Sequence, residues 1–143
     1  MENQITIIIG SACIEKNGKV LIAKRADDDT FYPGSWEFAG GKIEFGESPI
    51  AGTIREIKEE LGLDVTIKNV LTITHHLHET NPNKQFVILN FYAEMTDLNQ
   101  EVVLSHEHSA YSWIAVTDLD QYDLSPYTLE LIHEIKKHGL INL

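Results

Sequence analysis

Several residue types are scarce in this chain of 143 residues, and each shortage excludes a class of protein. The single cysteine, Cys13, excludes an internal disulfide and suits a reducing compartment, so we expect it to be a small buried core residue. The apolar run Ile5–Ile14 is interrupted by polar residues and glycine, and no basic leader precedes it. We therefore expect no signal peptide and no membrane-spanning segment, and we predict a cytoplasmic protein without a membrane partner.

Basic residues are also scarce, because 11 lysines and arginines stand against 22 aspartates and glutamates, for a formal net charge of −11. Such a surface repels nucleic acid polymers, so we expect none as a partner, and a phosphate-bearing partner would need metal ions. The hydrophobic content of 43% is enough for a core at this length. We predict a single domain over residues 1–143, either a monomer or a homodimer.

Turn residues divide the chain into short strands. Asn17-Gly18 indicates a tight turn between the apolar runs Ile5–Ile14 and Val20–Lys24, which predicts a hairpin. A polar turn around Pro82 likewise separates two apolar segments that we expect to pair as antiparallel strands. The strands predicted after the first hairpin lie near residues 36–38, 65–78, 86–95 and 111–116, and the rest of 26–46 is predicted to be loop.

Two helices are marked at both ends. Ser48-Pro49 and Gly62 bracket a helix of about Pro49–Leu61, and Ser125-Pro126 and Gly139 bracket a second one. Strands mixed with two helices indicate an α+β or three-layer α/β/α domain with a mixed sheet.

The first helix is expected to have an apolar face and an acidic face. Its apolar residues recur at spacings of four, three and four, which predicts burial of this stripe against the sheet. Three glutamates are expected together on the opposite side, because residues three and four apart are neighbours on a helix surface. The stripe is Ile50, Ile54, Ile57 and Leu61, and the glutamates are Glu56, Glu59 and Glu60.

This acidic cluster is unfavourable for the helix by itself. Like charges repel at these spacings, and the last turn lies at the negative end of the helix dipole. A bound cation would compensate, and carboxylate oxygens suit Mg²⁺ or Mn²⁺. The alternative is a solvated acidic face. Gly40-Gly41, just before the helix, favours the cation, because glycines let the backbone approach a ligand closely.

Residues Gly41 to Leu63 also match every fixed position of a 23-residue signature, the Nudix box. The matching residues are Gly41, Glu47, Arg55-Glu56-Ile57, Glu59-Glu60 and Gly62-Leu63. The chain thus resembles the Nudix hydrolases, and the surrounding "GSWEFAGGKIEFGES" is similar to the MutT branch, although Ala39 stands where many members have proline. The resemblance implies the fold of a Nudix-like α/β/α sandwich. It also implies an enzyme that hydrolyses nucleoside triphosphates, including oxidised ones, to a nucleoside monophosphate and pyrophosphate.

The resemblance also implies roles for individual residues. The family's metal ligands correspond to Glu56, Glu59, Glu60 and the carbonyl of Gly40, and Glu107 matches a further metal-site glutamate, with an ordinary loop acid as its alternative. Either Glu56 or Glu107 would be the general base, and the sequence does not choose between them. Arg55 and Glu47 correspond to a pair that braces the loop against the helix.

Candidates for substrate binding lie around the same loop. Arg25 matches a phosphate-contacting position of MutT-like enzymes, and Gly41 would offer its backbone, while Lys42 and Lys24 are weaker candidates. Phe38 would either stack on a base or belong to the core. The position that reads oxidised guanine in MutT-like enzymes falls at Thr128, and this residue does not predict 8-oxo-guanine specificity.

Other functions remain open at this point. The first is a Nudix hydrolase of ADP-ribose or another nucleoside diphosphate derivative, and the second is a silent nucleotide sensor, which could dispense with Glu59 and Glu60. Five histidines lie on one predicted strand or beside Glu107, and an HxH pair places two rings on one face, as a zinc pair would. The alternative for them is a solvent-facing or substrate-edge position. These histidines are His75, His76, His78, His106 and His108.

Overall fold

The computed structural model describes residues 3–139. Its elements follow one another as seven strands, two α-helices and one short 3-10 helix. In chain order they are β1 (Ile5–Lys16), β2 (Lys19–Arg25), β3 (Trp36–Glu37), β4 (Gly40–Lys42), α1 (Pro49–Leu61), β5 (Val65–Leu77), β6 (Lys84–Met95), β7 (His108–Ile114), η1 (Val116–Gln121) and α2 (Pro126–His138).

The strands form one mixed sheet. Its main path runs β3-β2-β1-β6-β5, with β4 paired to the middle of β1 and β7 paired to β2. Among the strands within residues 3–139, only β1 and β6 pair in parallel, in a register that places Ser11 beside Asn90, and the other pairs are antiparallel. The paired β1 and β6 are therefore the centre of the sheet, and β4 lies against β1 with Gly40 beside Ser11.

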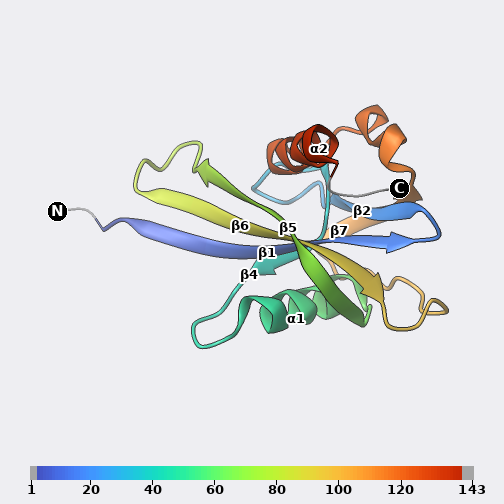
Figure 1. Cartoon of the computed structure of the whole chain (residues 1–143). Coiled ribbons are helices and arrows are strands. Elements are labelled where there is room, and N and C mark those ends of the chain that lie inside the picture. Colours follow the sequence, from blue (N-terminus) through green and yellow to red (C-terminus); the bar gives the residue numbers. More distant parts are fainter. Residues whose placement is uncertain (1–2, 140–143) are drawn as a thin grey trace.

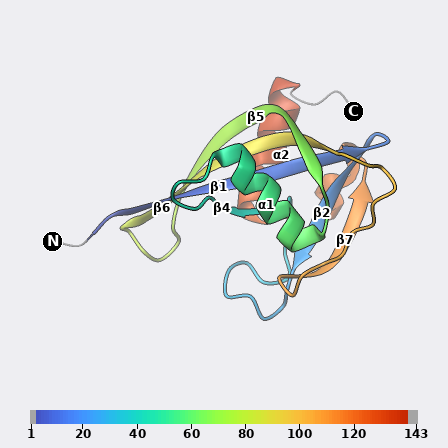
Figure 2. The ribbon, with the colours of Figure 1, turned by 90° about the horizontal axis from the view of Figure 1, so that it is seen from below.

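The two α-helices cover opposite faces of this sheet. Helix α2 lies on one side of the strands and α1 on the other, so that three layers are seen edge-on (Figure 1). The view from below shows α1 crossing the sheet in front of β1 and β4 (Figure 2). The predicted α/β/α sandwich with a mixed sheet is thus confirmed. No helix within residues 3–139 is long and apolar enough to cross a membrane.

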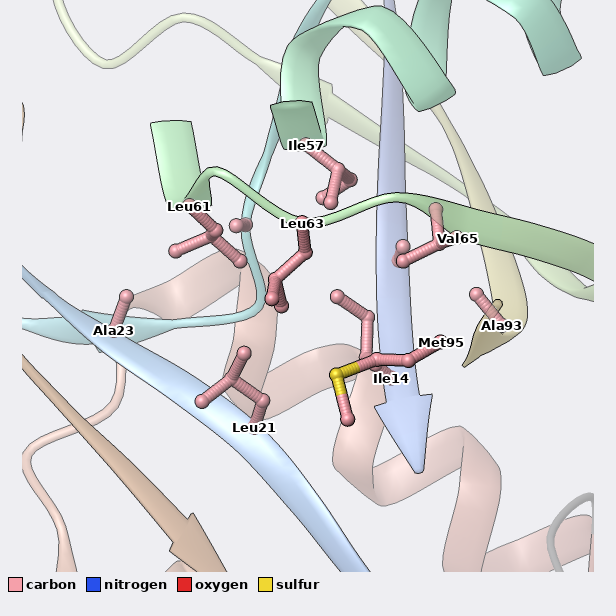
Figure 3. Close-up of a cluster of buried hydrophobic side chains, with 11 residues drawn as sticks. Ile14, Leu21, Ala23, Ile57, Leu61, Leu63, Val65, Ala93 and Met95 are labelled. Atoms are coloured by element: carbon pink, nitrogen blue, oxygen red, sulfur yellow. The ribbon is translucent and has the colours of Figure 1, made fainter. Parts of the chain in front are cut away.

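Each face of the sheet has its own hydrophobic core, because side chains alternate along the strands. On the α1 side, Ile14 and Leu21 meet Ile57, Leu61 and Leu63, as Figure 3 shows. On the α2 side the core is formed by residues of β1, β2 and α2 with their neighbours. These include Cys13, Val20, Ile22, Leu131, Ile132 and Ile135. The expectation that Cys13 is a buried core residue is confirmed, since it is 1% exposed.

Most predicted elements are confirmed, and the exceptions have physical causes. The two hairpins and both helices are present, with α1 at Pro49–Leu61 as predicted. The prediction for residues 26–46 is wrong in one respect, because Gly40–Lys42 is a strand and not a loop. Glycine has low strand propensity, so only the pairing with β1 creates β4. Strand β7 also begins at His108, three residues earlier than predicted.

The predicted apolar stripe of α1 is correct only in part. Ile57 and Leu61 are completely buried, but Ile50 in the first turn is 50% exposed. Thr53 is completely buried instead, because the helix lies close against Gly10 of β1. A Cβ on Gly10 would come within 1.8 Å of Thr53 Oγ1, so the missing side chain of Gly10 makes room for Thr53.

Candidate active site

A cavity beside β4 is lined by four carboxylates. Its volume is about 590 Å³. The acids come from three segments that are distant in sequence: β3, helix α1 and the turn before β7. They are Glu37, Glu56, Glu60 and Glu107. The fold thus brings three of the predicted metal ligands, Glu56, Glu60 and Glu107, to one cavity, together with Gly40 and Gly41.

The two glycines of β4 are required by close contacts. A Cβ on Gly40 would lie 2.1 Å from the carbonyl oxygen of Gly10, which is rigid backbone of β1. A Cβ on Gly41 would lie 2.4 Å from the carboxyl group of Glu56. The strand can therefore pair with β1 and admit the acids of α1 only because both residues lack a side chain.

Glu60 is buried and Glu59 is exposed, which corrects the prediction that the three helix glutamates lie together on the side opposite the buried apolar stripe. The exposed fraction of Glu60 is 5%, and the backbone N–H of Gly40 donates to its Oε2 over 3.0 Å. Burial, with smaller contributions from Glu107, Glu37 and Glu56, raises the pKa of Glu60 to about 10. The carboxyl group therefore carries a proton at neutral pH unless a cation replaces it.

Arg55 joins the loop before α1 to the acids on the helix. Its Nε and Nη2 each donate to a carboxylate oxygen of Glu47 over 2.8 Å, and Nη2 also reaches the carbonyl of Lys42 at 3.2 Å. Its Nη1 donates to Glu56 at 3.1 Å and to Glu59 at 3.2 Å. Glu59 is exposed. The pKa of Glu56 is raised, mainly because the residue is partly buried; Arg55 lowers this pKa, and the charges of Glu59 and Glu107 raise it.

Arg25 lines the cavity but is bound to the protein by all three of its nitrogens. Nε donates to the carbonyl of Phe31 at 2.6 Å, Nη1 to Glu37 at 3.0 Å and Nη2 to Asp29 at 2.6 Å. Glu37 also contacts the buried ring of His108, with 2.9 Å between Oε2 and Nε2. The network ties β3, β7 and the loop 26–35 together beside the carboxylates.

Aromatic side chains form another wall of the cavity. Phe31, Phe86 and Tyr127 pack with ring centroids 5.6 to 6.0 Å apart, and His78 stands 6.0 Å from Phe86. Phe38 is 5% exposed, belongs to the core on the α2 side and also lines the cavity, so the structure places it in both of the environments considered for it. Lys42 lies at the cavity as an exposed residue.

Comparison with known proteins identifies the family to which this chain belongs. The profile of the NUDIX domain matches residues 6–135 of this chain. The chain belongs to the Nudix hydrolase family. It is 34% identical to the CTP pyrophosphohydrolase of Escherichia coli (strain K12) over 127 residues, which cover 88% of each protein. It is 28% identical to the nucleoside triphosphatase NudI of Escherichia fergusonii over 121 residues, or 80% of this chain and 86% of that protein.

A solved structure has the same fold. The MutT protein from Methanosarcina mazei Go1 superimposes with a TM-score of 0.82 over 97% of this chain and 98% of that one, at 24% sequence identity. The resemblance inferred from the Nudix box is thus confirmed, as is the expectation of a hydrolase.

The carboxylates of this Nudix hydrolase fit a divalent cation by their chemistry. Nudix hydrolases generally use such ions. Within residues 3–139, Glu56 and Glu37 of the carboxylate cluster are paired with arginines, whereas the buried Glu60 has no basic side chain as a partner and accepts a hydrogen bond from the N–H of Gly40. Within residues 3–139, no three His, Cys, Asp or Glu side chains are already close enough to hold a metal ion between them. Glu56 is turned towards Arg55 and Glu60 towards Gly40, so their carboxylates would have to reorient to share an ion.

The five histidines have separate contacts. His75 bonds to Gln85 at 2.7 Å, His76 packs on Tyr127 with 4.2 Å between centroids, and the ring of His78 accepts from the backbone N–H groups of the following turn. His108 is buried against Glu37, and His106 is exposed.

The sequence reasoning missed two groups of residues at this Nudix site. Glu37 lies between Trp36 and Phe38. An acidic residue between two large aromatics in a predicted strand was the sequence feature that could have indicated Glu37 as a site residue. Phe31, Phe86 and Tyr127 carry no local indication, because they meet only through the packing of α2 and loop 26–35 on the sheet.

Proposed function

We propose that this Nudix hydrolase cleaves a nucleoside triphosphate to a nucleoside monophosphate and pyrophosphate, with Mg²⁺ or Mn²⁺ as cofactor and within a single domain. One observation carries the proposal. The cavity that holds four carboxylates continues into a region walled by Phe31, Phe86 and Tyr127, so one end suits metal-bound phosphates and the other suits a flat base. The names of the two Escherichia relatives agree with this substrate class.

Different residues of the site would bind the metal ion, accept the proton of the water and position the loop. A divalent ion held by Glu56, Glu59, Glu60, Glu107 and the carbonyl of Gly40 would offset the phosphate charge and acidify a water molecule. Glu56 or Glu107 would accept the proton of that water. Arg55 and Glu47 would keep the loop and the helix acids in place.

Substrate binding would use the cavity walls. Lys42 and the backbone of Gly41 would contact the phosphates beside the carboxylates. Arg25 would contribute its charge while remaining bound to Glu37 and Asp29, because that network fixes its position. Phe38 would support the base from the apolar side of the cavity.

A panel of nucleotides assayed with Mg²⁺ tests the proposal. A triphosphate should yield pyrophosphate rather than phosphate, and Glu59→Gln or Glu60→Gln should abolish that release. Glu44→Gln, at an exposed position whose side chain makes no hydrogen bond or ion pair within residues 3–139, is the control and should keep activity. Turnover of ADP-ribose-type substrates alone would overturn the proposal in favour of a diphosphate-derivative hydrolase. No turnover of any nucleotide would overturn it in favour of a sensor.

The general base can be separated from a pure ligand by pH profiles. Loss of the base should lower kcat and remove its dependence on the ionisation of that group. We therefore expect one of Glu56→Gln and Glu107→Gln to flatten the acidic limb of the kcat profile, while the other weakens the apparent affinity for Mg²⁺. If both variants keep the wild-type profile, neither residue is the base.

A further inference from the structure

The orientation of the Asn90 side chain is fixed at the floor of the cavity. Asn90 lies on β6, is 3% exposed and lines the cavity. Its Nδ2, with two hydrogens, lies within hydrogen-bonding distance of three acceptors: the carbonyls of Thr72 and Ile88, each at 3.3 Å, and Thr74 Oγ1 at 3.2 Å. Carbonyl oxygens can only accept, so the amide nitrogen has to face them and Oδ1 has to face the other way.

This orientation fixes the direction of the next hydrogen bond. Asn90 Oδ1 lies 3.2 Å from Ser11 Oγ on the neighbouring strand β1, where the register pairs the two residues. Because Oδ1 can only accept, the hydroxyl proton of Ser11 is committed to it. No group within residues 3–139 donates to Ser11 Oγ, which keeps its lone pairs free. Ser11 thus presents an acceptor, and no donor, to the cavity that it lines.

The surroundings of Ser11 suit the ring of a base rather than phosphates. Apolar residues of the sheet and of α2 line the same cavity: Ile9 and Ile88, each two positions along the strand from Ser11 or Asn90, and Phe86 and Leu131. Gly40, the residue paired with Ser11 across β1 and β4, donates its N–H to Glu60 of the carboxylate cluster. A nucleotide with its phosphates at the carboxylates would therefore turn the polar edge of its base towards Ser11.

We propose that Ser11 determines base specificity by accepting a hydrogen bond from an exocyclic amino group of the substrate. The inference rests on the proposed nucleotide function and names the class of base, which is one with an amino group at pyrimidine C4 or purine C6. A keto oxygen in that position would face the lone pairs of Ser11 without a proton between the two oxygens. A buried acceptor without a hydrogen-bond donor raises the free energy of the complex, so substrates with keto bases are rejected.

Two pairs of substrates that differ at this group provide the first measurement. CTP should exceed UTP, or ATP should exceed ITP, in kcat/KM by about tenfold or more, as expected for one lost buried hydrogen bond. Equal values within both pairs would overturn the proposal. The pairs share ribose and triphosphate, so differences in phosphate binding cancel.

Two variants of the hydrogen bond between Ser11 and Asn90 provide the second measurement. Ser11→Ala removes the acceptor and should reduce the amino-to-keto ratio to near one. Asn90→Leu removes the group that takes the Ser11 proton, so the hydroxyl can donate and turnover of the keto substrate should rise relative to the amino substrate. Ser109→Ala, at an exposed serine of β7, is the matched control and should keep the wild-type ratio. A full amino preference in Ser11→Ala would overturn the proposal.

Binding of the products separates this inference from the proposed function. Calorimetry with CMP and UMP, and with AMP and IMP, needs no hydrolysis. Tighter binding of the amino member in the wild type and its loss in Ser11→Ala would support the role of Ser11 even if no triphosphate were cleaved. Hydrolysis of triphosphates without discrimination within either pair would leave the proposed function intact and overturn the role of Ser11.

Discussion

Arg55 holds Glu47 by two parallel hydrogen bonds, with 2.8 Å from Nε to Oε2 and 2.8 Å from Nη2 to Oε1. This is the paired geometry in which arginine binds carboxylates most strongly. The remaining donor, Nη1, contacts Glu56 and Glu59 on α1. One guanidinium therefore positions both the loop before the helix and two of the predicted metal ligands.

Glu47→Gln should lower activity although Glu47 contacts no substrate. Without the second anionic oxygen, Arg55 loses its paired contact and positions Glu56 less well. We expect kcat/KM to fall by about tenfold to a hundredfold, as is typical when a residue that orients a metal ligand is lost. Steady-state kinetics at saturating Mg²⁺ measure this, with Glu44→Gln in the same loop as the control. Unchanged kinetics in Glu47→Gln would show that the brace is not needed.

The same pair should contribute to stability in acid. The hydrogen bonds from Arg55 and the backbone N–H of Glu44 lower the pKa of Glu47 to about 2, from an ordinary value of 4.5. A carboxylate with a lowered folded-state pKa stabilises the fold above the unfolded value and loses that effect as the pH falls through the folded value. The difference in Tm between wild type and Glu47→Gln should thus shrink from pH 4.5 down to about 2. A difference that grows in acid would contradict the assignment.

Glu60 should produce the opposite pH dependence. Its folded-state pKa of about 10 lies above the ordinary 4.5, so the folded protein keeps a proton that the unfolded chain releases. In metal-free buffer the contribution of Glu60 to stability is complete below pH 4.5 and is lost as the pH rises towards 10. Thermal unfolding of Glu60→Gln should not show this loss, whereas the exposed Glu59→Gln should behave as wild type.

Mg²⁺ should act on the same group. An ion that binds only the folded protein raises Tm, and here it has to displace the proton of Glu60. We expect Mg²⁺ or Mn²⁺ to raise the Tm of wild type more than that of Glu60→Gln, with an increment that grows between pH 6 and 9. Equal Tm shifts in the two proteins would count against Glu60 as a metal ligand.

The two glycines of β4 should differ when replaced by alanine. In Gly40→Ala the new methyl group meets the carbonyl oxygen of Gly10, which cannot move without breaking the pairing of β4 with β1, so we expect a large loss of Tm. In Gly41→Ala it meets only the mobile end of Glu56, which can rotate away. That variant should keep its Tm but lose activity. Similar behaviour of both variants in melting and kinetics would contradict this difference.

Glu37 should position the loop 26–35 through Arg25. Glu37→Gln keeps the shape of the side chain but weakens its contacts with Arg25 and His108, at a cost of about 1 to 3 kcal/mol in the free energy of unfolding. We expect faster amide exchange in residues 26–35 and a higher KM, because Phe31 on that loop lines the cavity. Asp28→Asn, at an exposed site of the same loop, is the control, and an exchange pattern unchanged in Glu37→Gln would refute the coupling.

The sequence was sufficient for those features that depend on neighbouring residues. Both helices begin at Ser-Pro and end at glycine, because a cap and a left-handed residue act within one turn of the chain. The hairpin at Asn17-Gly18 follows from positive φ angles at both residues. The Nudix box, as a contiguous stretch, likewise identified the family and the hydrolase class.

Tertiary structure decided what depends on contacts between distant segments. Helix α1 has a regular apolar stripe, yet Ile50 is exposed and Glu60 is buried, because the position of Gly10 in β1 sets how the helix lies on the sheet. The strand at Gly40–Lys42 exists only through its pairing with β1.

The base side of the cavity shows the same division. Ser11 and Asn90 are 79 residues apart, and neither has a distinctive sequence context. Only the parallel register of β1 and β6 makes them neighbours, and only the carbonyls around Asn90 fix the direction of their hydrogen bond. The sequence by itself thus determined the family and the hydrolase class, because these reside in a contiguous motif. The tertiary structure decided which side chains meet in the cavity, because burial and hydrogen-bond direction arise only when distant strands pair.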